Sequence, residues 1–208
     1  MGAARELWAG NEDLARRCLD HPFVRGLGDG DLAEARYRRF IAQDAFFLDA
    51  FARAYALGVA RAPDRRSMRD LHALLSGVFE EQRLHERVAA ASGIDLGAVR
   101  PLPATAAYTD FLVAAAFRAS LGELLAAMAP CMRLYRFLGE ELARRPHGDA
   151  YGAWIATYAG TEYGELVATI EALLDRHATG SAREGESYRR ALELEHRFFE
   201  AAWGADER

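Results

Sequence analysis

The sequence predicts an all-α fold, built as a single-domain multi-helix bundle over residues 1–208. Apolar residues recur at spacings of three and four along nearly the whole chain, and no segment alternates with the two-residue period of a half-buried strand. Proline and glycine fall in short clusters between these segments, as they do between packed helices. With 208 residues, 51% of them hydrophobic, the chain can bury one full core.

Each predicted helix is bounded by one of these clusters. In chain order, helices are expected over residues 4–19, 32–61 and 65–91, from about 105 to 120, across Cys131 as far as Pro146, from about 149 onward, and over 183–203. A break beginning at His21-Pro22 should end where Asp31 caps the second helix. Gly160 is a candidate interruption of the sixth helix, because glycine costs about 1 kcal/mol relative to alanine inside a helix.

The charge and composition limit the classes of partner. A net charge of −5 is spread along the chain, which argues against a nucleic-acid surface and against an anionic membrane. No apolar segment approaches the roughly twenty residues that cross a bilayer, and the N-terminal residues are too polar for a signal peptide. We therefore expect a cytoplasmic protein whose partners are small molecules or other proteins. Its two cysteines stand in different helices and form neither a disulfide framework nor a zinc motif.

Cys131 is the sharpest sign of chemistry. Pro130 precedes it within a helical pattern, removes one backbone donor and leaves the carbonyl of Ala126 without its usual partner. Tyr135 lies one turn later on the same face. A thiol beside a disturbed helix predicts a pocket, although a buried cysteine is most often a small hydrophobic residue of the core.

Two carboxylates interrupt apolar helix faces. Asp44 lies within an aromatic stripe of the second helix, and Glu195 lies within a similar stripe of the last. A buried carboxylate needs a partner, which for Asp44 could be one of the many arginines in a structural ion pair. An apolar setting also raises a carboxyl pKa towards neutrality, as acid/base catalysis requires.

Several tyrosines also face inward. Tyr108 and Tyr158 each share a helix face with large apolar residues, and most such tyrosines are core residues with one satisfied hydroxyl. The coincidence of two acids, a thiol and several phenols on the inner faces of separate helices nevertheless favours a ligand site, since helical bundles build their sites from such projections.

The chain carries a series of motifs in order: His21-Pro22-Phe23-Val24 with Asp29-Gly30, Gln43-Asp44 with Phe46-Phe47-Leu48, Glu81-Gln82-Arg83-Leu84-His85, Ala107-Tyr108-Thr109, Pro130-Cys131 with Leu134-Tyr135, Trp154-Ile155 with Tyr158, and Glu195 with Phe198-Phe199. Over nearly its whole length it thus resembles the TenA/thiaminase II family, which shares the heme-oxygenase-like helical bundle. The resemblance implies hydrolysis of 4-amino-5-aminomethyl-2-methylpyrimidine to the hydroxymethyl pyrimidine, with thiamin as a second substrate. It also implies a homotetramer and no cofactor or metal.

The resemblance also implies roles for individual residues. Cys131 corresponds to the nucleophile that adds to the pyrimidine ring, and Glu195 to the group that transfers protons. Asp44 corresponds to the residue that holds the amidine face of the ring. The remaining implied binding residues are aromatic: Phe47, which would stack on the ring, and Tyr108, Tyr135 and Tyr158, which would line the site. Two departures from the family pattern concern substrate preference: Phe47 replaces a frequent tyrosine, and Met132-Arg133 replaces an aromatic residue.

Two other classes of function compete with this hypothesis. Glu81 and His85 lie four apart on a helix and could share a metal, as in a heme-oxygenase-like di-iron oxidase, but such a centre needs several more inward carboxylates and histidines. A non-catalytic pyrimidine-binding or regulatory protein is the other alternative. The sequence has no helix-turn-helix signature or basic stripe that would support DNA contact.

Overall fold

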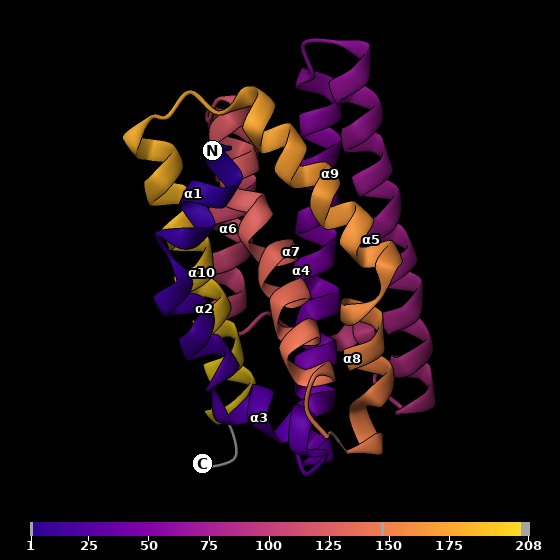
Figure 1. The fold of residues 1–208 in the computed structure, drawn as a ribbon. Helices are drawn as coiled ribbons and strands as arrows, with labels where there is room; N and C mark the ends of the chain where they lie inside the picture. The colour runs from indigo at the N-terminus through magenta and orange to yellow at the C-terminus, as the bar shows by residue number, and fades with distance from the viewer. Residues whose placement is uncertain (1, 147, 205–208) are drawn as a thin grey trace.

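The structure, a computed structural model, describes residues 2–146 and 148–204. Within these ranges it contains only helices and their connections, which confirms the all-α prediction (Figure 1). The α-helices are α1 (Ala3–Ala9), α2 (Glu12–Leu19), α3 (Pro22–Asp29), α4 (Glu34–Arg61), α5 (Arg65–Ala91), α6 (Pro103–Arg118), α7 (Leu121–Ala143), α8 (Gly152–Ala159), α9 (Thr161–His177) and α10 (Ala182–Trp203), and two short 3₁₀ turns are η1 (Leu96–Ala98) and η2 (Asp149–Tyr151).

The single helix predicted over residues 4–19 is wrong, because α1 and α2 are separate helices. Gly10 ends α1, and Asn11 occupies the position before α2. The side-chain amide of Asn11 donates to the carbonyl of Leu7 at 2.8 Å, so it satisfies a carbonyl that a continued helix would have satisfied. Arg189 of α10 donates in turn to Asn11 Oδ1 at 3.2 Å. The break is thus held by one local and one tertiary hydrogen bond.

The segment read as a break after His21 contains the helix α3. His21 Nδ1 accepts a hydrogen bond from the backbone N–H of Phe23 at 3.1 Å, and Pro22 occupies the first helical position, where its missing donor costs nothing. Gly30 ends the helix in the left-handed conformation, with φ of 78°. Proline at the start and glycine just past the end are helix-boundary signals, so local chemistry could have identified α3.

The other helix boundaries follow the predictions closely, apart from the cap of α4. That helix begins at Glu34 with Ala33 as its N-cap, so the prediction that Asp31 caps it is wrong. The third predicted helix matches α5, and the last begins one residue earlier than expected. Gly160 does separate α8 from α9. Ser120 caps α7 through a capping box with Glu123, which explains the break after α6.

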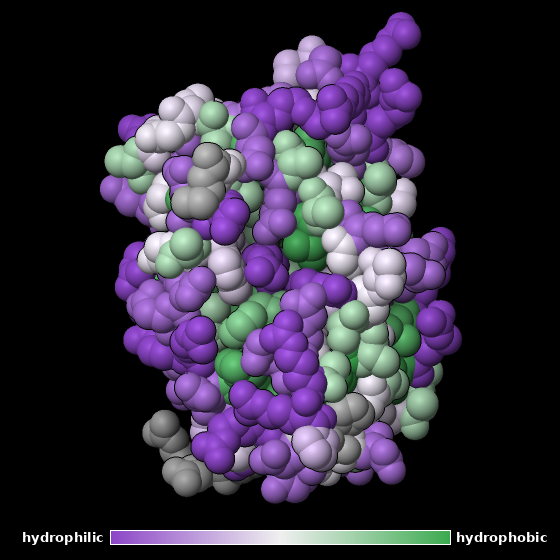
Figure 2. Space-filling model, viewed as in Figure 1, coloured by the Kyte–Doolittle hydropathy of each residue, from purple (hydrophilic) through white to green (hydrophobic). Residues whose placement is uncertain are grey.

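The helices pack around α7. It contacts α8, α9 and α10 along its length, while α4 packs between α5 and α6 (Figure 1). All of these helices contribute to one cluster of buried apolar side chains. On the face shown in Figure 2, hydrophilic residues cover most of the surface and hydrophobic residues are visible mainly in the furrows between helices. None of the described helices is long and apolar enough to cross a membrane.

The junction between α8 and α9 is fixed by α7. Arg136 Nη1 donates to the carbonyl of Ala159 at 2.8 Å and to that of Gly160 at 2.5 Å. The Arg136 Nε also pairs with Glu140 at 2.7 Å. One guanidinium therefore satisfies the carbonyls that the break at Gly160 leaves open, and it fixes the start of α9 against α7.

Gly139 allows the backbone of α8 to approach α7 closely. A Cβ added at Gly139 would lie 2.7 Å from the backbone nitrogen of Ala159 and 2.7 Å from the carbonyl carbon of Tyr158. Because backbone cannot swing aside, we expect Gly139→Ala to lower the free energy of unfolding by about 1–3 kcal/mol. Chemical denaturation would measure it. Gly185→Ala is the control, since its nearest neighbour would be Leu7 at 4.0 Å. If Gly139→Ala left the free energy of unfolding unchanged, the backbones of α7 and α8 could move apart without a loss of stability.

Candidate active site

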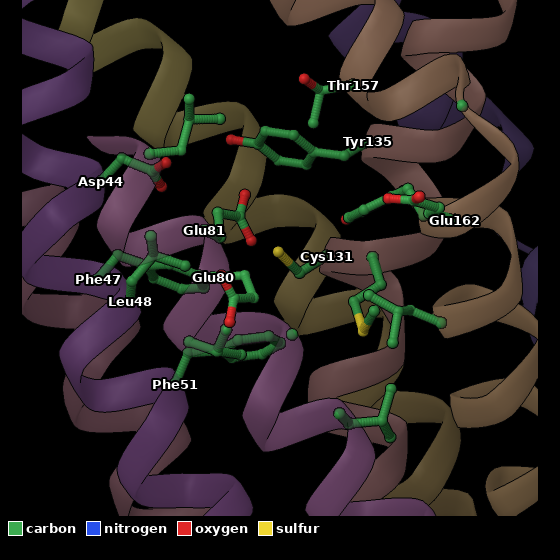
Figure 3. Close-up of a pocket in the computed structure, with 18 of the residues that line it drawn as sticks. Asp44, Phe47, Leu48, Phe51, Glu80, Glu81, Cys131, Tyr135, Thr157 and Glu162 are labelled. Atoms are coloured by element: carbon green, nitrogen blue, oxygen red, sulfur yellow. The ribbon is translucent and has the colours of Figure 1, made fainter. Parts of the chain in front are cut away.

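A cavity of about 670 Å³ lies among α4, α5, α7, α8 and α9. Figure 3 shows side chains from these helices directed into it, with the sulfur of Cys131 pointing towards its centre. Four of the residues predicted from the sequence line it: Asp44, Phe47, Cys131 and Tyr135. The pocket predicted beside Pro130 and Cys131 is therefore present, and α7 continues as one helix through Pro130.

The thiol of Cys131 is nearly enclosed. Its residue is 8% exposed, and that exposed surface faces the cavity. Burial raises the pKa of Cys131 well above its ordinary value, and the nearby carboxyl groups of Glu195, Glu81 and Asp44 raise it further. These surroundings favour the thiol over the thiolate. Ionisation of Cys131 consequently requires a proton acceptor within the site.

Glu195 is the carboxyl group best placed to accept that proton. It projects from α10 with 2% exposure and lies within hydrogen-bonding reach of the Cys131 thiol. Its Oε1 also accepts a hydrogen bond from the hydroxyl of Tyr108 at 2.8 Å. Burial raises the pKa of Glu195 to about 7, against the opposing effect of these two donors. Near neutral pH this carboxyl can therefore both take and give a proton.

Asp44 is buried, as the sequence predicted, but its partner is not an arginine. The residue is 4% exposed, and its Oδ2 lies 3.4 Å from Nδ1 of His85 on α5. Burial lowers the pKa of His85 to about 4, so the histidine is neutral at neutral pH. Burial, together with Glu81 and Glu195, raises the pKa of Asp44 well above its ordinary value. The expected structural ion pair is thus replaced by a contact that favours uncharged groups.

A third carboxyl group, Glu81, lines the cavity from α5. Its Oε1 accepts a hydrogen bond from the hydroxyl of Tyr158 at 2.6 Å. Burial raises the pKa of Glu81, and the Tyr158 hydrogen bond opposes that shift. Three carboxyl groups therefore surround Cys131 from three helices.

The remaining predicted site residues lie behind the cavity wall. Tyr108 donates to Glu195 and Tyr158 donates to Glu81, and Glu195 lies within hydrogen-bonding reach of Cys131. The ring of Tyr108 packs on Phe47 at a centroid distance of 4.8 Å, and that of Tyr158 on Tyr135 at 4.9 Å. Some of the predicted residues thus line the cavity, and the others form hydrogen bonds or ring contacts next to those lining residues.

From the sequence, Glu81 is predicted only as a possible metal ligand and not as part of this wall. On α5 it follows Leu74 and Val78 and precedes His85 at spacings of three and four. The same pattern identified Asp44 and Glu195, so the signal was available. Tyr163 and Glu162 at the start of α9 also line the cavity. No periodicity marks these two, because their position depends on the break at Gly160.

Two groups of side chains within the described ranges could hold a metal ion, with ligand atoms within 4.8 Å of one another: Asp44, Glu81 and His85, and His21, His196 and Glu200. In the second group, Nδ1 of His21 accepts a backbone hydrogen bond, so Nε2 carries the proton of the neutral ring and faces Glu200 at 3.2 Å. A metal bound there would have to displace that proton. This geometry favours a hydrogen bond over a metal site.

The group at the cavity fits a di-iron centre poorly. It offers a single histidine, whereas such centres in helical bundles draw on several carboxylates and on Glu-x-x-His pairs from two helices. Its histidine also directs Nδ1 towards Asp44. The donor set thus favours a hydrogen-bonded polar cluster.

The fold and the cavity together define a helical bundle with a cavity that is lined by one thiol and several carboxyls and is of a size that suits a small molecule. The chain belongs to the TENA/THI-4/PQQC family, whose model matches residues 8–205. It is similar to the aminopyrimidine aminohydrolase of Halalkalibacterium halodurans, with 34% identity over 86% of this chain and 84% of that protein.

Solved structures agree with this assignment. A protein described as a TenA family transcription regulator from Silicibacter sp. TM1040 superposes with a TM-score of 0.91 and 32% identity, covering 97% of this chain and 96% of that one. A domain from Shewanella denitrificans, described as having a heme oxygenase-like fold, gives a TM-score of 0.70 at 13% identity, covering 96% of this chain and 89% of that one. The heme-oxygenase-like bundle is thereby confirmed as the fold.

Proposed function

We propose that this protein is an aminopyrimidine aminohydrolase of the thiaminase II type, which converts 4-amino-5-aminomethyl-2-methylpyrimidine (hereafter the aminomethyl pyrimidine) to the hydroxymethyl pyrimidine. Thiamin is proposed as a second substrate. The observation that carries this proposal is the thiol of Cys131 at a cavity wall, within reach of Glu195. The similarity to relatives named for this activity supports it.

In the proposed reaction, the sulfur of Cys131 forms a bond to a carbon of the pyrimidine ring. Its proton passes to Glu195, which then gives it to a ring nitrogen. The bond between the exocyclic methylene and the amine then breaks, with its electron pair leaving on the nitrogen. Water then adds its oxygen to the methylene and gives up a proton to the released amine. The ring nitrogen returns its proton through Glu195 to the sulfur as the carbon–sulfur bond breaks, which restores the thiol. A carboxyl with a pKa of about 7 suits both proton transfers.

Binding of the ring is assigned to the α4 face of the cavity. Asp44 offers a carboxyl that can pair with the amidine edge of an aminopyrimidine, and Phe47 offers a ring face one turn away on the same helix. Phe47 carries no hydroxyl, so in this protein it contributes stacking alone. Tyr135 closes the opposite side from α7. Tyr108 and Tyr158 then serve by fixing Glu195 and Glu81.

Asp44→Asn should mainly weaken substrate binding. The amide keeps the shape of the side chain. It replaces one carboxyl oxygen with an NH₂ group, which can only donate, so the pairing with the amidine edge of the ring is altered. We expect KM for the aminomethyl pyrimidine to rise about tenfold or more, with a smaller change in kcat. Steady-state kinetics would measure both constants. If neither changed, Asp44 would be a structural acid paired only with His85.

The proposed function is tested by analysing products. Mass spectrometry would follow the protein and its Cys131→Ala variant after incubation with the aminomethyl pyrimidine and with thiamin. Cysteine-dependent formation of the hydroxymethyl pyrimidine is the expected result, and the faster substrate identifies the main activity. The absence of product from both compounds would overturn the proposal.

The alternatives make different predictions. A metal oxidase using Asp44, Glu81 and His85 would purify with stoichiometric metal. A binding or regulatory protein would keep its biological effect in a Cys131→Ala variant, and a DNA-binding regulator would shift a duplex with sequence preference. Metal analysis and a gel-shift assay separate these cases from the hydrolase.

We also propose that the protein acts in the cytoplasm as a homotetramer. Large apolar side chains that a second copy could cover are exposed on α4, α5 and α6: Phe46, Met68, Phe79 and Phe117, the last 68% exposed. Light scattering would measure the assembly. A monomer at micromolar concentration would contradict it.

A further inference from the structure

The carboxyl of Glu81 is only partly used by the protein itself. Its Oε1 accepts the hydroxyl of Tyr158, whereas no hydrogen bond reaches Oε2 from the residues that the structure describes. The side chain is only partly buried and lines the cavity. In Figure 3 the carboxyl lies in the region bounded by Asp44, Tyr135 and Cys131. Glu81 can therefore receive a donor from a bound ligand.

The charge of the cavity favours a cationic ligand. Among its lining residues Asp44, Glu80, Glu81 and Glu162 are acidic and Arg87 is basic. Glu80 is paired with Arg83 at the surface, whereas no arginine or lysine of the described chain lies within 4 Å of the Glu81 carboxyl. In a low-dielectric cavity a ligand cation would be attracted far more strongly than in water.

The polar cluster around Glu81 lacks a positive charge. His85 stands beside Asp44 with its Nδ1 3.4 Å from Oδ2, but burial keeps it neutral. The two carboxyls repel each other when both are ionised, and the neutral imidazole does not offset this. A shared proton or a bound cation would lower the repulsion. A ligand ammonium group would supply both the charge and N–H donors.

We propose that Glu81 binds the positively charged nitrogen of the leaving group, and so makes the site selective for substrates with a cationic substituent on the exocyclic methylene. This inference rests on the proposed function. An aliphatic amine is protonated at neutral pH, so the aminomethyl pyrimidine arrives as an ammonium ion. One of its N–H groups donates to Oε2 of Glu81. The leaving-group nitrogen, for which no binding residue was predicted from the sequence, thus has Glu81 as its partner.

The chemistry of cleavage fixes what this contact does. The carbon–nitrogen bond breaks with its electron pair on nitrogen, so the ammonium departs as neutral ammonia and the ion pair with Glu81 is lost. The contact therefore favours binding of the substrate and release of the products. In thiamin the departing nitrogen belongs to an aromatic thiazolium ring and bears no hydrogen. Thiamin should consequently depend less on Glu81 than the aminomethyl pyrimidine does.

Equilibrium binding tests the inference without turnover. In a Cys131→Ser background, isothermal titration calorimetry would compare the aminomethyl pyrimidine with the neutral hydroxymethyl pyrimidine, which keeps the same ring. Adding Glu81→Gln should weaken the amine at least about tenfold and the hydroxymethyl compound less than about threefold. Glu81→Asp retains the charge and should recover part of the amine affinity.

Glu86→Gln is the matched control, since Glu86 is exposed on the same helix outside this cavity. It should change neither affinity. Equal losses for both ligands on Glu81→Gln would mean that Glu81 only shapes the wall, and no loss for either would mean that it is not used; each result overturns the inference. If the Cys131→Ser parent bound neither pyrimidine, the proposed function itself would fail, and the inference with it.

Discussion

Replacing Cys131 with serine is expected to lower kcat for both substrates at least about a thousandfold while leaving the fold intact. Serine has nearly the shape of cysteine, and the side chain is almost enclosed, so packing changes little. A hydroxyl is a far weaker nucleophile near neutral pH, and a carboxyl with a pKa of about 7 cannot ionise it. Product formation measured over hours, with the thermal unfolding midpoint as the fold check, would test this.

The second cysteine provides the control for this prediction. Cys18 of α2 is fully buried and does not line the cavity. Cys18→Ala should keep kcat within about threefold, although the loss of buried volume lowers stability. If Cys131→Ser retained more than about one part in a thousand of the activity, nucleophilic addition by Cys131 would not be the main route.

The sequence predicted the fold where periodic apolar spacing and local boundary signals agree. The helix α5 matches its prediction because Asp64 caps it, the apolar stripe continues without interruption, and Ser92-Gly93 ends it. The break between α1 and α2 also carries a local signal, because Gly10 stands at the end of one helix and Asn11 at the start of the next. The hydrogen bond from Arg189 to Asn11 adds a contact that spacing cannot predict, since these residues meet only when α10 packs on α2.

The site could be predicted to a similar extent. Asp44 and Glu195 were identified because a carboxylate on an apolar helix face requires a partner, and Cys131 because Pro130 and Tyr135 lie beside it; all three are buried in the structure. Which groups meet across helices was not predictable. An arginine was the expected partner of Asp44, but a neutral histidine has that place. The spacing along one helix gives no information about the register of its neighbour.

The phenols illustrate the same limit. Tyr108 and Tyr158 have the spacing of inward-facing residues, which predicts core tyrosines with one satisfied hydroxyl, whereas only the family resemblance implies that they line the ligand site. Each donates to a carboxyl group of another helix, Glu195 or Glu81, and a contact with the ligand stays a prediction. Whether the hydroxyl of an inward tyrosine reaches a ligand or a carboxyl group depends on how its helix packs against the others. Spacing along one helix does not contain this information.

Glu195→Gln is expected to remove the pH dependence of the proposed reaction together with most of its rate. If Glu195 takes the proton of Cys131, its carboxylate form is required, and that form increases as pH rises through about 7. In the unmodified protein kcat/KM should therefore rise with pH through this range. The amide cannot accept a proton, so the variant should lose about a hundredfold or more in kcat and lack this rise. Glu193→Gln, on the surface of the same helix, should preserve both.

The same carboxyl gives a second readout that is independent of turnover. The pKa of Glu195 in the folded protein, about 7, lies above its ordinary value of 4.5, so the folded state binds this proton more tightly than the unfolded state. Its contribution to stability is fully present below pH 4.5 and is lost as pH rises through about 7. Glu195→Gln should thus show a smaller fall in the free energy of unfolding over that window. If the Glu195→Gln variant kept both the rise of kcat/KM with pH and the full fall in the free energy of unfolding, these effects would belong to Asp44 or Glu81.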